Sequence, residues 1–465
     1  MSKERVDLMA NELKKKYGLL TAICMVVGIV VGSGVFFKAE AILTKTGGNL
    51  KIGILAWIIG GIIMIISAYT FSILATKYEK VNGVVDYAEA TIGEKYGYVI
   101  GWFLSTIYYP TLTMALAWLS ARYTLVVFQG DNADPTSGMC FVLTGFYLIA
   151  SYALNTLSPI ISGKFQVSTT FIKLVPLLLM GVVGTIYGIA NDNGVLVQNF
   201  TTVVNEVPAS EAIFSAVCAT VFAYEGWIIA TSINAELKDG KKNLPKALVI
   251  GSLIIVAIYV LYYVGLAGAI PNADMMAGGQ AAARNAFGTV FGKAMGTGIF
   301  VFVIVSCLGT LNGLMLGCTR GIYSIASRGR GPAPHVFGYL DKHTNMPGNS
   351  SILALLLCAA WLVYFYFANL NSSTAGALKM FAFDPTELPI VTIYPFYIPI
   401  FVMMFKDKNL SPVKRFVVPT LAILGCLVMV VAAFVAHLKE IPGYLIIFAV
   451  IMAIGFAFMK KKKVA

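Results

Sequence analysis

Residues 27–36 read VGIVVGSGVF and lie inside an apolar segment, 18–45, that is long enough to cross a membrane. Gly28 and the run Gly32-Ser33-Gly34 fall at the depth where an open backbone costs most. Small residues at such spacing favour close helix packing, which accounts for Gly28 and Gly32. Two glycines around a serine also loosen the backbone. The run by itself therefore leaves two interpretations, a packing face and a break in the helix.

The composition is that of an integral membrane protein. Of 465 residues, 58% are hydrophobic and only 12% are charged, whereas a soluble domain carries about 25% charged residues. The net charge of +12 does not indicate nucleic-acid binding, because the basic residues form short clusters between apolar runs. The seven cysteines form no CxxC pair and there are three histidines, so we expect no disulfide framework and no metal site.

The apolar runs predict an all-α polytopic membrane protein with twelve transmembrane helices. The predicted helices are 18–45, 52–76, 97–128, 138–156, 159–190, 209–235, 245–270, 283–326, 349–367, 386–405, 414–436 and 441–459. A short amphipathic or re-entrant helix is expected within 81–97. The charged N-terminus leads into a full-length span, which predicts no cleaved signal peptide.

The basic residues orient this arrangement. The loops and tails assigned to one side hold 24 Lys and Arg residues, and those of the other side hold five. Because basic loops stay in the cytoplasm, both termini, the tail 1–17 and the basic tail 460–465, are predicted to be cytoplasmic in a plasma-membrane protein.

A second irregular stretch, TVFAYEGW at 220–227, places Glu225 and Gly226 inside the sixth helix. A carboxylate at this depth normally faces a cavity or a partner. The two irregular helices are five helices apart, which predicts a 5+5 inverted repeat with broken helices 1 and 6. The repeats are 18–190 and 209–405, followed by two further helices in 414–459.

Broken membrane helices are tolerated where their freed groups line a cavity or meet a ligand. The half-helix after a break offers amides and the one before it offers carbonyls. A zwitterionic amino acid needs both. We therefore expect the amides of Ser33, Gly34 and Val35 to bind a carboxylate, with Gly32 giving the backbone room. Carbonyls of Val30, Phe222 and Ala223 are expected to bind an ammonium group.

Four stretches resemble the amino acid–polyamine–organocation superfamily, and within it the L-amino acid transporter branch. They are GSGVF, FAYEGW, NAELKDGKKNLPKAL (234–248) and RGIYSIASRGRGPAPHVF (320–337). The resemblance implies a leucine-transporter-like fold and sodium-independent amino acid exchange, as in a bacterial alanine–serine–cysteine exchanger. It also implies carboxylate contacts at Ser33 and Gly34, ammonium contacts at Val30 and Phe222, and a gate formed by the Phe222 ring.

Animal members of this branch attach a glycoprotein through a cysteine in the loop between helices 3 and 4. Here that loop reads QGDNADPTSGMC, and its one cysteine, Cys140, begins helix 4. We therefore expect no disulfide-linked heavy subunit, and the sequence is compatible with a monomer.

Lys173, in TTFIKLVPLLL, lies deep in helix 5 with no acidic residue near it in sequence. One interpretation is that it extends to an interface. The other is that its ammonium replaces a coupling cation, donating to the carbonyls of Gly28 and Ile29 and to the hydroxyls of Ser306 or Thr310. The resemblance supports the second interpretation.

Glu225 has three interpretations: compensation of a cationic lumen, contact with the substrate, and proton coupling. Arg320 and Arg328 are expected to pair with acids such as Glu236 or Asp86. The sequence holds no nucleotide loop, catalytic triad or cofactor motif, so an enzyme or sensor is disfavoured. The predicted function is exchange of small neutral L-amino acids, with a proton-coupled symporter or a carrier of cationic amino acids or polyamines as the alternative.

Overall fold

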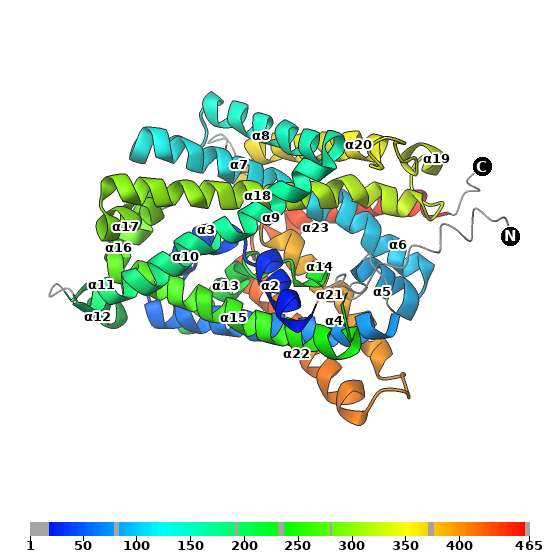
Figure 1. Cartoon of the computed structure of the whole chain (residues 1–465), viewed down its shortest axis with the longest axis horizontal. Coiled ribbons are helices and arrows are strands. Elements are labelled where there is room, and N and C mark those ends of the chain that lie inside the picture. The colour runs from blue at the N-terminus through cyan, green and yellow to red at the C-terminus, as the bar shows by residue number, and fades with distance from the viewer. Residues whose placement is uncertain are drawn as a thin grey trace.

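The computed structural model describes residues 18–78, 83–190, 194–230, 237–279, 281–370 and 376–460. Within these ranges the chain is built of helices, most of which run along the long axis of the molecule (Figure 1). The predicted tail 1–17 and all but the first residue of the tail 460–465 lie outside the described residues.

The first half of the chain contains a long, unbroken α4 and several interrupted helices. The bounds are α2 (Leu19–Val30), α3 (Gly34–Lys45), α4 (Leu50–Tyr78), α5 (Val84–Thr91), α6 (Glu94–Phe103), α7 (Tyr109–Gln129), α8 (Gly138–Leu157), α9 (Pro159–Ile172), α10 (Leu174–Leu179), α11 (Thr185–Ala190) and α12 (Val195–Thr201). The π-helical turns Leu104–Tyr108 and Met180–Gly184 join α6 to α7 and α10 to α11.

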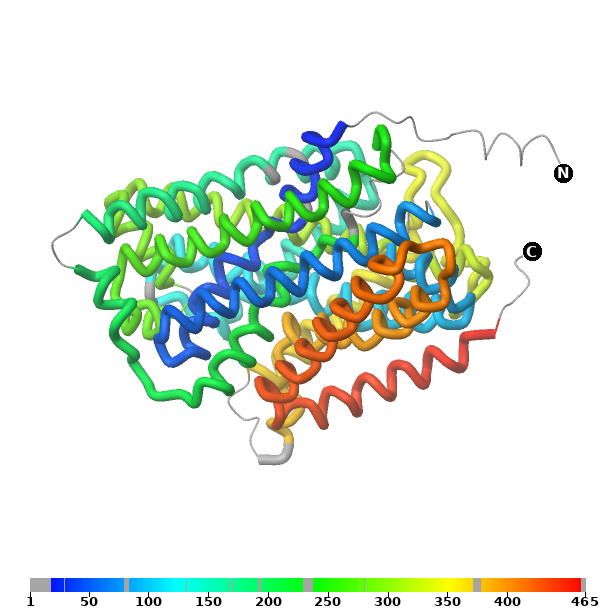
Figure 2. Tube along the Cα trace, turned by 90° about the horizontal axis from the view of Figure 1, so that it is seen from below, coloured from blue at the N-terminus to red at the C-terminus, as the bar shows by residue number. Residues whose placement is uncertain are grey.

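The second half repeats this mixture of long and interrupted helices. The bounds are α13 (Ala209–Thr220), α14 (Trp227–Ala230), α15 (Gly240–Ala269), α16 (Asn272–Gly278), α17 (Ala281–Phe291), α18 (Lys293–Ala326), α19 (Pro334–Phe337), α20 (Gly348–Phe365), α21 (Leu388–Met404), α22 (Val418–Ala436) and α23 (Ile441–Ala457). The π-helical turns Tyr366–Leu370 and Val413–Val417 extend α20 and α22. Figure 2 shows α22 and α23, in orange and red, along one side of the bundle.

The helices have the length and composition of membrane spans. Among the described residues seven helices are long and apolar enough to cross a membrane, or eight if the bent pair Leu174–Ala190 and Val195–Thr201 forms one span. Leu19–Gly28, Ala209–Thr220, Leu388–Met404 and Ile441–Ala457 are shorter apolar helices. Large apolar side chains such as Phe128 and Ile160 are exposed, as expected for a surface that faces lipid. The chain is thus a multi-pass, all-helical membrane protein.

The predicted helix 283–326 is interrupted. This segment is too long for one straight span, and it lies in α17 and α18, which are separated at Gly292 with a φ of 80°. The two helices then pack together, because Gly296 lies against the backbone of Gly288, where an added Cβ would be 2.5 Å from the Gly288 nitrogen. Glycines let the two backbones approach this closely.

The breaks of the interrupted helices lie near the middle of the molecule. In the view of Figure 1, α2, α13 and α14 lie between α18 on one side and α15 on the other. The end of the molecule that holds α5, α6 and α19 is called the terminal end below, and the end that holds α11, α12 and α16 the opposite end (Figure 1). At the terminal end Arg328 pairs with Asp86 at 2.5 Å and with Glu89 at 3.1 Å.

The short helix expected within 81–97 corresponds to α5 and the start of α6. The expected pair between Arg328 and Asp86 is present. Glu236 lies outside the described residues, as does the end of the predicted helix 209–235 beyond Ala230.

Candidate functional site

The first break separates α2 from α3. Helix α2 ends at Val30, Val31 is extended with φ −64° and ψ 105°, and α3 begins at Gly34. The Ser33 amide donates to the Thr310 hydroxyl of α18 at 3.3 Å, and that hydroxyl donates to the Ser306 carbonyl at 3.1 Å. The break therefore exposes an amide at Ser33 that a neighbouring side chain satisfies.

The second break separates α13 from α14. Helix α13 ends at Thr220 and α14 begins at Trp227. Gly226 has a φ of 110°, a conformation that residues with a Cβ rarely adopt. The Glu225 amide donates to the Phe222 carbonyl at 3.3 Å, so the chain turns tightly rather than continuing the helix.

The two breaks touch each other. A Cβ on Gly34 would be 2.7 Å from the Ala223 Cα and 2.8 Å from the Phe222 Cδ1, so only glycine fits here without displacement. The rings of Phe37 and Phe222 lie 5.3 Å apart between centroids. This close approach brings the freed backbone groups of both helices to one place.

Tyr259 of α15 joins the breaks from a third side. Its hydroxyl lies 2.9 Å from the Ala223 carbonyl and 3.3 Å from the Val30 carbonyl. These are two of the three carbonyls predicted to bind an ammonium group. Tyr259 is not among the predicted site residues, because nothing in the apolar run IYVLYY (258–263) distinguishes it from the tyrosines beside it.

Lys173 lies between α9 and α10, and its side chain is buried. Its Nζ donates to the Gly28 carbonyl at 2.8 Å, so the expected contact with Gly28 is present. Within the described part of the chain no hydrogen bond joins Lys173 to Ser306 or Thr310, and that expectation is wrong. Thr310 instead bonds with Ser33, and the buried Ser306 hydroxyl has no partner among the described side chains and backbone.

The interruptions line a cavity of about 430 Å³. Six predicted site residues line it: Val30, Gly32, Gly34, Phe222, Ala223 and Glu225. Lys173 and Thr310 line it as well, whereas Ser33 and Val35 are buried beside it. Toward the terminal end the wall continues through Val84, Val85 and the exposed Arg320. The cavity thus extends from the two breaks toward the terminal end.

Glu225 brings a carboxylate into this cavity. The Tyr108 hydroxyl and the Gly226 amide lie beside it as hydrogen-bond donors. Tyr109, Tyr394 and Tyr397 lie close enough to the Glu225 carboxylate for an electrostatic interaction with it. Among the described residues it forms no ion pair, although Lys173 and Arg320 line the same cavity.

The arrangement is suited to a small zwitterion. Backbone amides and carbonyls converge within one cavity, together with a buried lysine and a carboxylate that are not paired with each other. Apolar and aromatic walls exclude water and strengthen hydrogen bonds to a bound polar group.

Comparison with known proteins agrees with this geometry. Residues 17–457 match the amino acid permease family. The serine/threonine exchanger SteT of Bacillus subtilis is 29% identical over 85% of this chain and 84% of its own length. The b(0,+)-type amino acid transporter 1 of Mus musculus is 25% identical over 87% of this chain and 83% of its own length. The human cystine/glutamate transporter is 25% identical over 72% and 66%, respectively.

These matches cover nearly every described helix, including both breaks and the cavity between them. They show that the chain is a transporter and not an enzyme. The chain therefore belongs to the amino acid permease family of the amino acid–polyamine–organocation superfamily, whose members carry amino acids across membranes.

Proposed function

We propose that this protein exchanges small neutral L-amino acids, such as alanine, serine and cysteine, by sodium-independent alternating access. The observation that carries the proposal is the cavity at which the backbone groups of both interrupted helices, outside any regular helix, come together. Its volume of about 430 Å³ suits a small ligand. A relative named as a serine/threonine exchanger supports small hydroxylated or aliphatic substrates.

The proposed binding mode of the substrate follows from the side chains that form hydrogen bonds with the backbone groups at the two breaks. Thr310 accepts from the Ser33 amide, as a substrate carboxylate would. Tyr259 donates to the carbonyls of Val30 and Ala223, as a substrate ammonium would. In the bound state the substrate carboxylate accepts hydrogen bonds from the amides of Ser33, Gly34 and Val35. The substrate ammonium donates hydrogen bonds to the carbonyls of Val30, Phe222 and Ala223. The Phe222 ring covers the substrate.

We assign Lys173 the part of a fixed cation. Its ammonium donates a hydrogen bond to the Gly28 carbonyl, two residues before α2 ends, and it has no acidic partner among the described residues. A positive charge at the end of a half-helix stabilises the carbonyl end of that helix. This removes the need for a bound sodium ion and favours exchange over ion-driven uptake.

Glu225 is assigned contact with the side chain of the substrate. Its carboxylate faces the cavity beside the hydroxyl of Tyr108, so it accepts a hydrogen bond from a serine hydroxyl or a cysteine thiol. The same carboxylate favours a second candidate function, transport of cationic amino acids or polyamines or proton-coupled symport. A cationic side chain would be paired by Glu225, whereas in symport Glu225 would carry the proton.

The wider architecture proposed here has twelve spans, with residues 18–190 and 209–405 as inverted five-helix repeats and 414–459 as two added helices. The termini are cytoplasmic in the plasma membrane, so the cavity now extends toward the cytoplasm. The protein works without a disulfide-linked heavy subunit, which the described cysteines support because Cys140 is buried.

The test is transport by the purified protein in liposomes. Labelled alanine is supplied outside, and the vesicles contain unlabelled alanine, serine, arginine or no amino acid. Uptake that requires internal alanine or serine and ignores proton and sodium gradients supports the proposal. Uptake into empty vesicles driven by an inward proton gradient contradicts exchange, and preference for arginine reassigns the substrate.

A further inference from the structure

A second cluster of charged side chains lies away from the candidate site, and its centre is Glu387. This residue immediately precedes α21, and its side chain is 1% exposed. Its Oε1 lies 2.5 Å from the Nζ of Lys38, and its Oε2 lies 2.9 Å from the Nζ of Lys45. The Nε2 of His437, just after α22, is 2.8 Å from Oε2. Side chains of α3 and of the segment after α22 therefore both contact the carboxylate that precedes α21.

The charges of the cluster compensate one another. Asp384 adds a second carboxylate, 3.4 Å from the Nζ of Lys38, so two ammonium groups face two carboxylates. The ammonium groups of Lys38 and Lys45 each lie against one oxygen of the buried Glu387 carboxylate. A buried ion pair resists loss of either partner, because the remaining charge is left without compensation.

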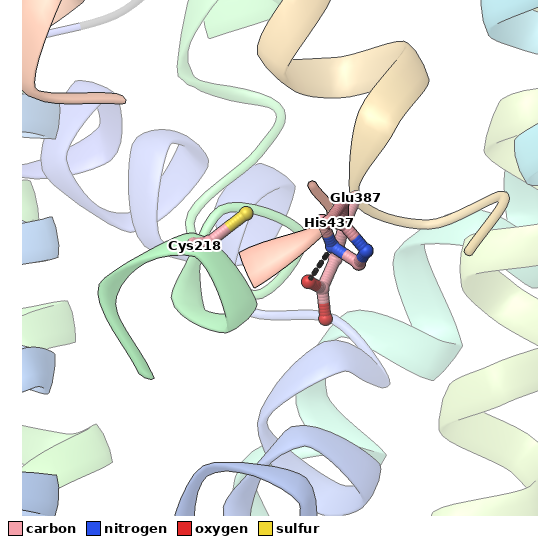
Figure 3. A group of neighbouring side chains, drawn as sticks. All are labelled: Cys218, Glu387 and His437. Carbon is pink, nitrogen blue, oxygen red and sulfur yellow. Dashed lines mark hydrogen bonds and ion pairs between the residues drawn. The ribbon is translucent and has the colours of Figure 1, made fainter. Parts of the chain in front are cut away.

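The same cluster includes three residues whose side chains are of types that bind metal ions. Figure 3 shows Cys218 of α13 near Glu387 and His437, and one possible ligand atom from each lies within 4.8 Å of the others. However, both oxygens of Glu387 already face ammonium groups. A divalent cation would have to enter beside two positive charges, so the geometry favours an ion-pair cluster over a metal site.

The position of the cluster relative to the cavity gives it a role. Lys38 is on α3, one turn after the first break, and its Nζ lies 5.5 Å from the centroid of the Phe37 ring. Phe37 in turn packs on Phe222 in the wall of the main cavity. Passing from the main cavity toward the opposite end therefore means crossing first an aromatic layer and then the charged cluster.

Beyond that barrier lies a second cavity of about 480 Å³. Phe37, Lys38, Lys45, Asp384 and His437 form part of its wall. The main cavity extends instead toward the terminal end, past Val84 and Arg320. The two cavities are thus separated where α3 meets the start of α21.

We propose that Glu387 is a gating residue, whose ion pairs with Lys38 and Lys45 fasten α3 against α21 and close the substrate cavity at the opposite end. Opening that end requires these pairs to separate and become hydrated, as α3 moves away from α21. The proposal rests on the alternating-access function above, and it names the contact that sets the balance between the two open states. Two packings of this interface then interconvert as a switch.

Cys218 provides a native reporter of the opening. It is buried beside the cluster, so a membrane-impermeant thiol reagent added at the opposite end reaches it only when the gate opens. Cys24 is the exposed cysteine of the described chain, so the measurement uses a Cys24→Ser background, and a further Cys218→Ser change shows which labelling comes from Cys218.

Glu387→Gln is the test variant, because it keeps the shape of the side chain and removes the charge. We expect Cys218 to be labelled about tenfold faster or more, since the buried ammonium of Lys38 and the half-buried ammonium of Lys45 then favour the hydrated, open state. Glu440→Gln is the matched control: Glu440 lines the same second cavity and has no ion pair among the described residues. Its labelling rate is expected to equal that of the parent.

Lys45→Gln provides a second variant should Glu387→Gln fail to fold, because the Lys45 side chain is 25% exposed. It is expected to raise the labelling rate less than Glu387→Gln does, and Glu387→Asp is expected to restore part of the parent's protection. An unchanged labelling rate in folded Glu387→Gln or Lys45→Gln protein overturns the proposal. So does protection of Cys218 by Zn²⁺ that His437→Ala abolishes, because the cluster would then be a metal site.

The outcome is separable from that of the transport test, since labelling needs no substrate. Faster labelling in a protein that carries no amino acid supports the gate and rejects the proposed function. Amino acid exchange with unchanged labelling supports the function and rejects the gate.

Discussion

Between α2 and α3 the chain opens beside a lysine, and between α13 and α14 it opens beside a glutamate. At the first break Lys173 binds the Gly28 carbonyl, and the Thr310 hydroxyl satisfies the Ser33 amide. At the second break Tyr259 satisfies the Ala223 carbonyl, and Glu225 extends into the cavity. Neither charged group has an ion pair among the described residues.

This difference separates two tasks. The first break is held by contacts with Lys173 and Thr310, and we propose that its backbone groups bind the part common to all amino acids. The second break carries a side chain that projects into the cavity, where substrates differ from one another. In the proposed binding mode the backbone groups of both breaks hold the substrate's amino and carboxylate groups, whereas Glu225 of the second break contacts its side chain, so each kind of recognition can be perturbed separately.

The largest effect is expected where the two breaks touch. Gly34→Ala places a Cβ 2.7 Å from the Ala223 Cα, so the broken helices must move apart. We expect the exchange rate in liposomes to fall about 100-fold, because a displacement of about 1 Å at a binding site has effects of that size. Gly163→Ala, at a glycine with open space around it, should leave the rate unchanged. Normal exchange by Gly34→Ala would mean that the breaks need not touch.

Lys173→Ala tests the first break alone. Removing a charged donor from the Gly28 carbonyl should slow exchange about 10- to 100-fold, since such hydrogen bonds contribute about 1.5–3 kcal/mol. Substrate affinity, measured by binding to the purified protein, should change much less, because Lys173 acts on the helix and not on the substrate. Lys164→Ala, an exposed lysine on the same helix, is the control. Loss of affinity without loss of rate would move Lys173 into the substrate site.

Glu225→Gln tests the second break. The variant should discriminate less between serine and alanine by about three- to tenfold, because a neutral amide is a weaker acceptor than a carboxylate. Tyr108→Phe should shift the same ratio in the same direction, through loss of the hydroxyl beside Glu225. The ratio of half-saturation constants for serine and alanine is the measurement. An equal change for both substrates would show that Glu225 does not contact the side chain.

Tyr259→Phe is expected to have the smallest effect and the opposite sign. It removes the hydroxyl from the Val30 and Ala223 carbonyls, so a substrate ammonium no longer competes with it. Apparent affinity should rise about two- to fivefold, in line with about 1 kcal/mol for one neutral hydrogen bond. Tyr263→Phe is the control, because its buried hydroxyl has no partner among the described residues. Weaker binding by Tyr259→Phe would place the ammonium elsewhere.

Much of the fold could be predicted because its signals are local. Apolar length predicts membrane helices, and glycine beside serine or glutamate indicates where a helix opens. The predicted bounds 138–156 and 414–436 lie within one residue of Gly138–Leu157 and Val413–Ala436. The length of the segment 283–326 indicates a tilt or an interruption, but it does not give the position at Gly292, because a single glycine in an apolar run is also compatible with an unbroken helix.

Parts of the candidate site could be predicted for the same reason. Gly34, Glu225 and Lys173 are unusual in any membrane helix, so their types alone drew attention. The contacts that Tyr259 and Thr310 make with the two breaks could not be predicted, since tyrosine and threonine are common in such helices. The Ser33–Thr310 bond joins residues 277 positions apart, and the Lys38–Glu387 pair joins residues 349 positions apart.

The sequence alone determined where this chain enters the membrane, where its helices lose their regular backbone, and which charges had to be buried. Those properties depend on short stretches, through apolar length and the conformational freedom of glycine. Only the tertiary structure decided which hydroxyl satisfies which freed backbone group, and that Lys38 meets Glu387 beyond the cavity. Those pairings depend on how distant helices pack, because each polar group in an apolar surrounding must find its partner across the fold.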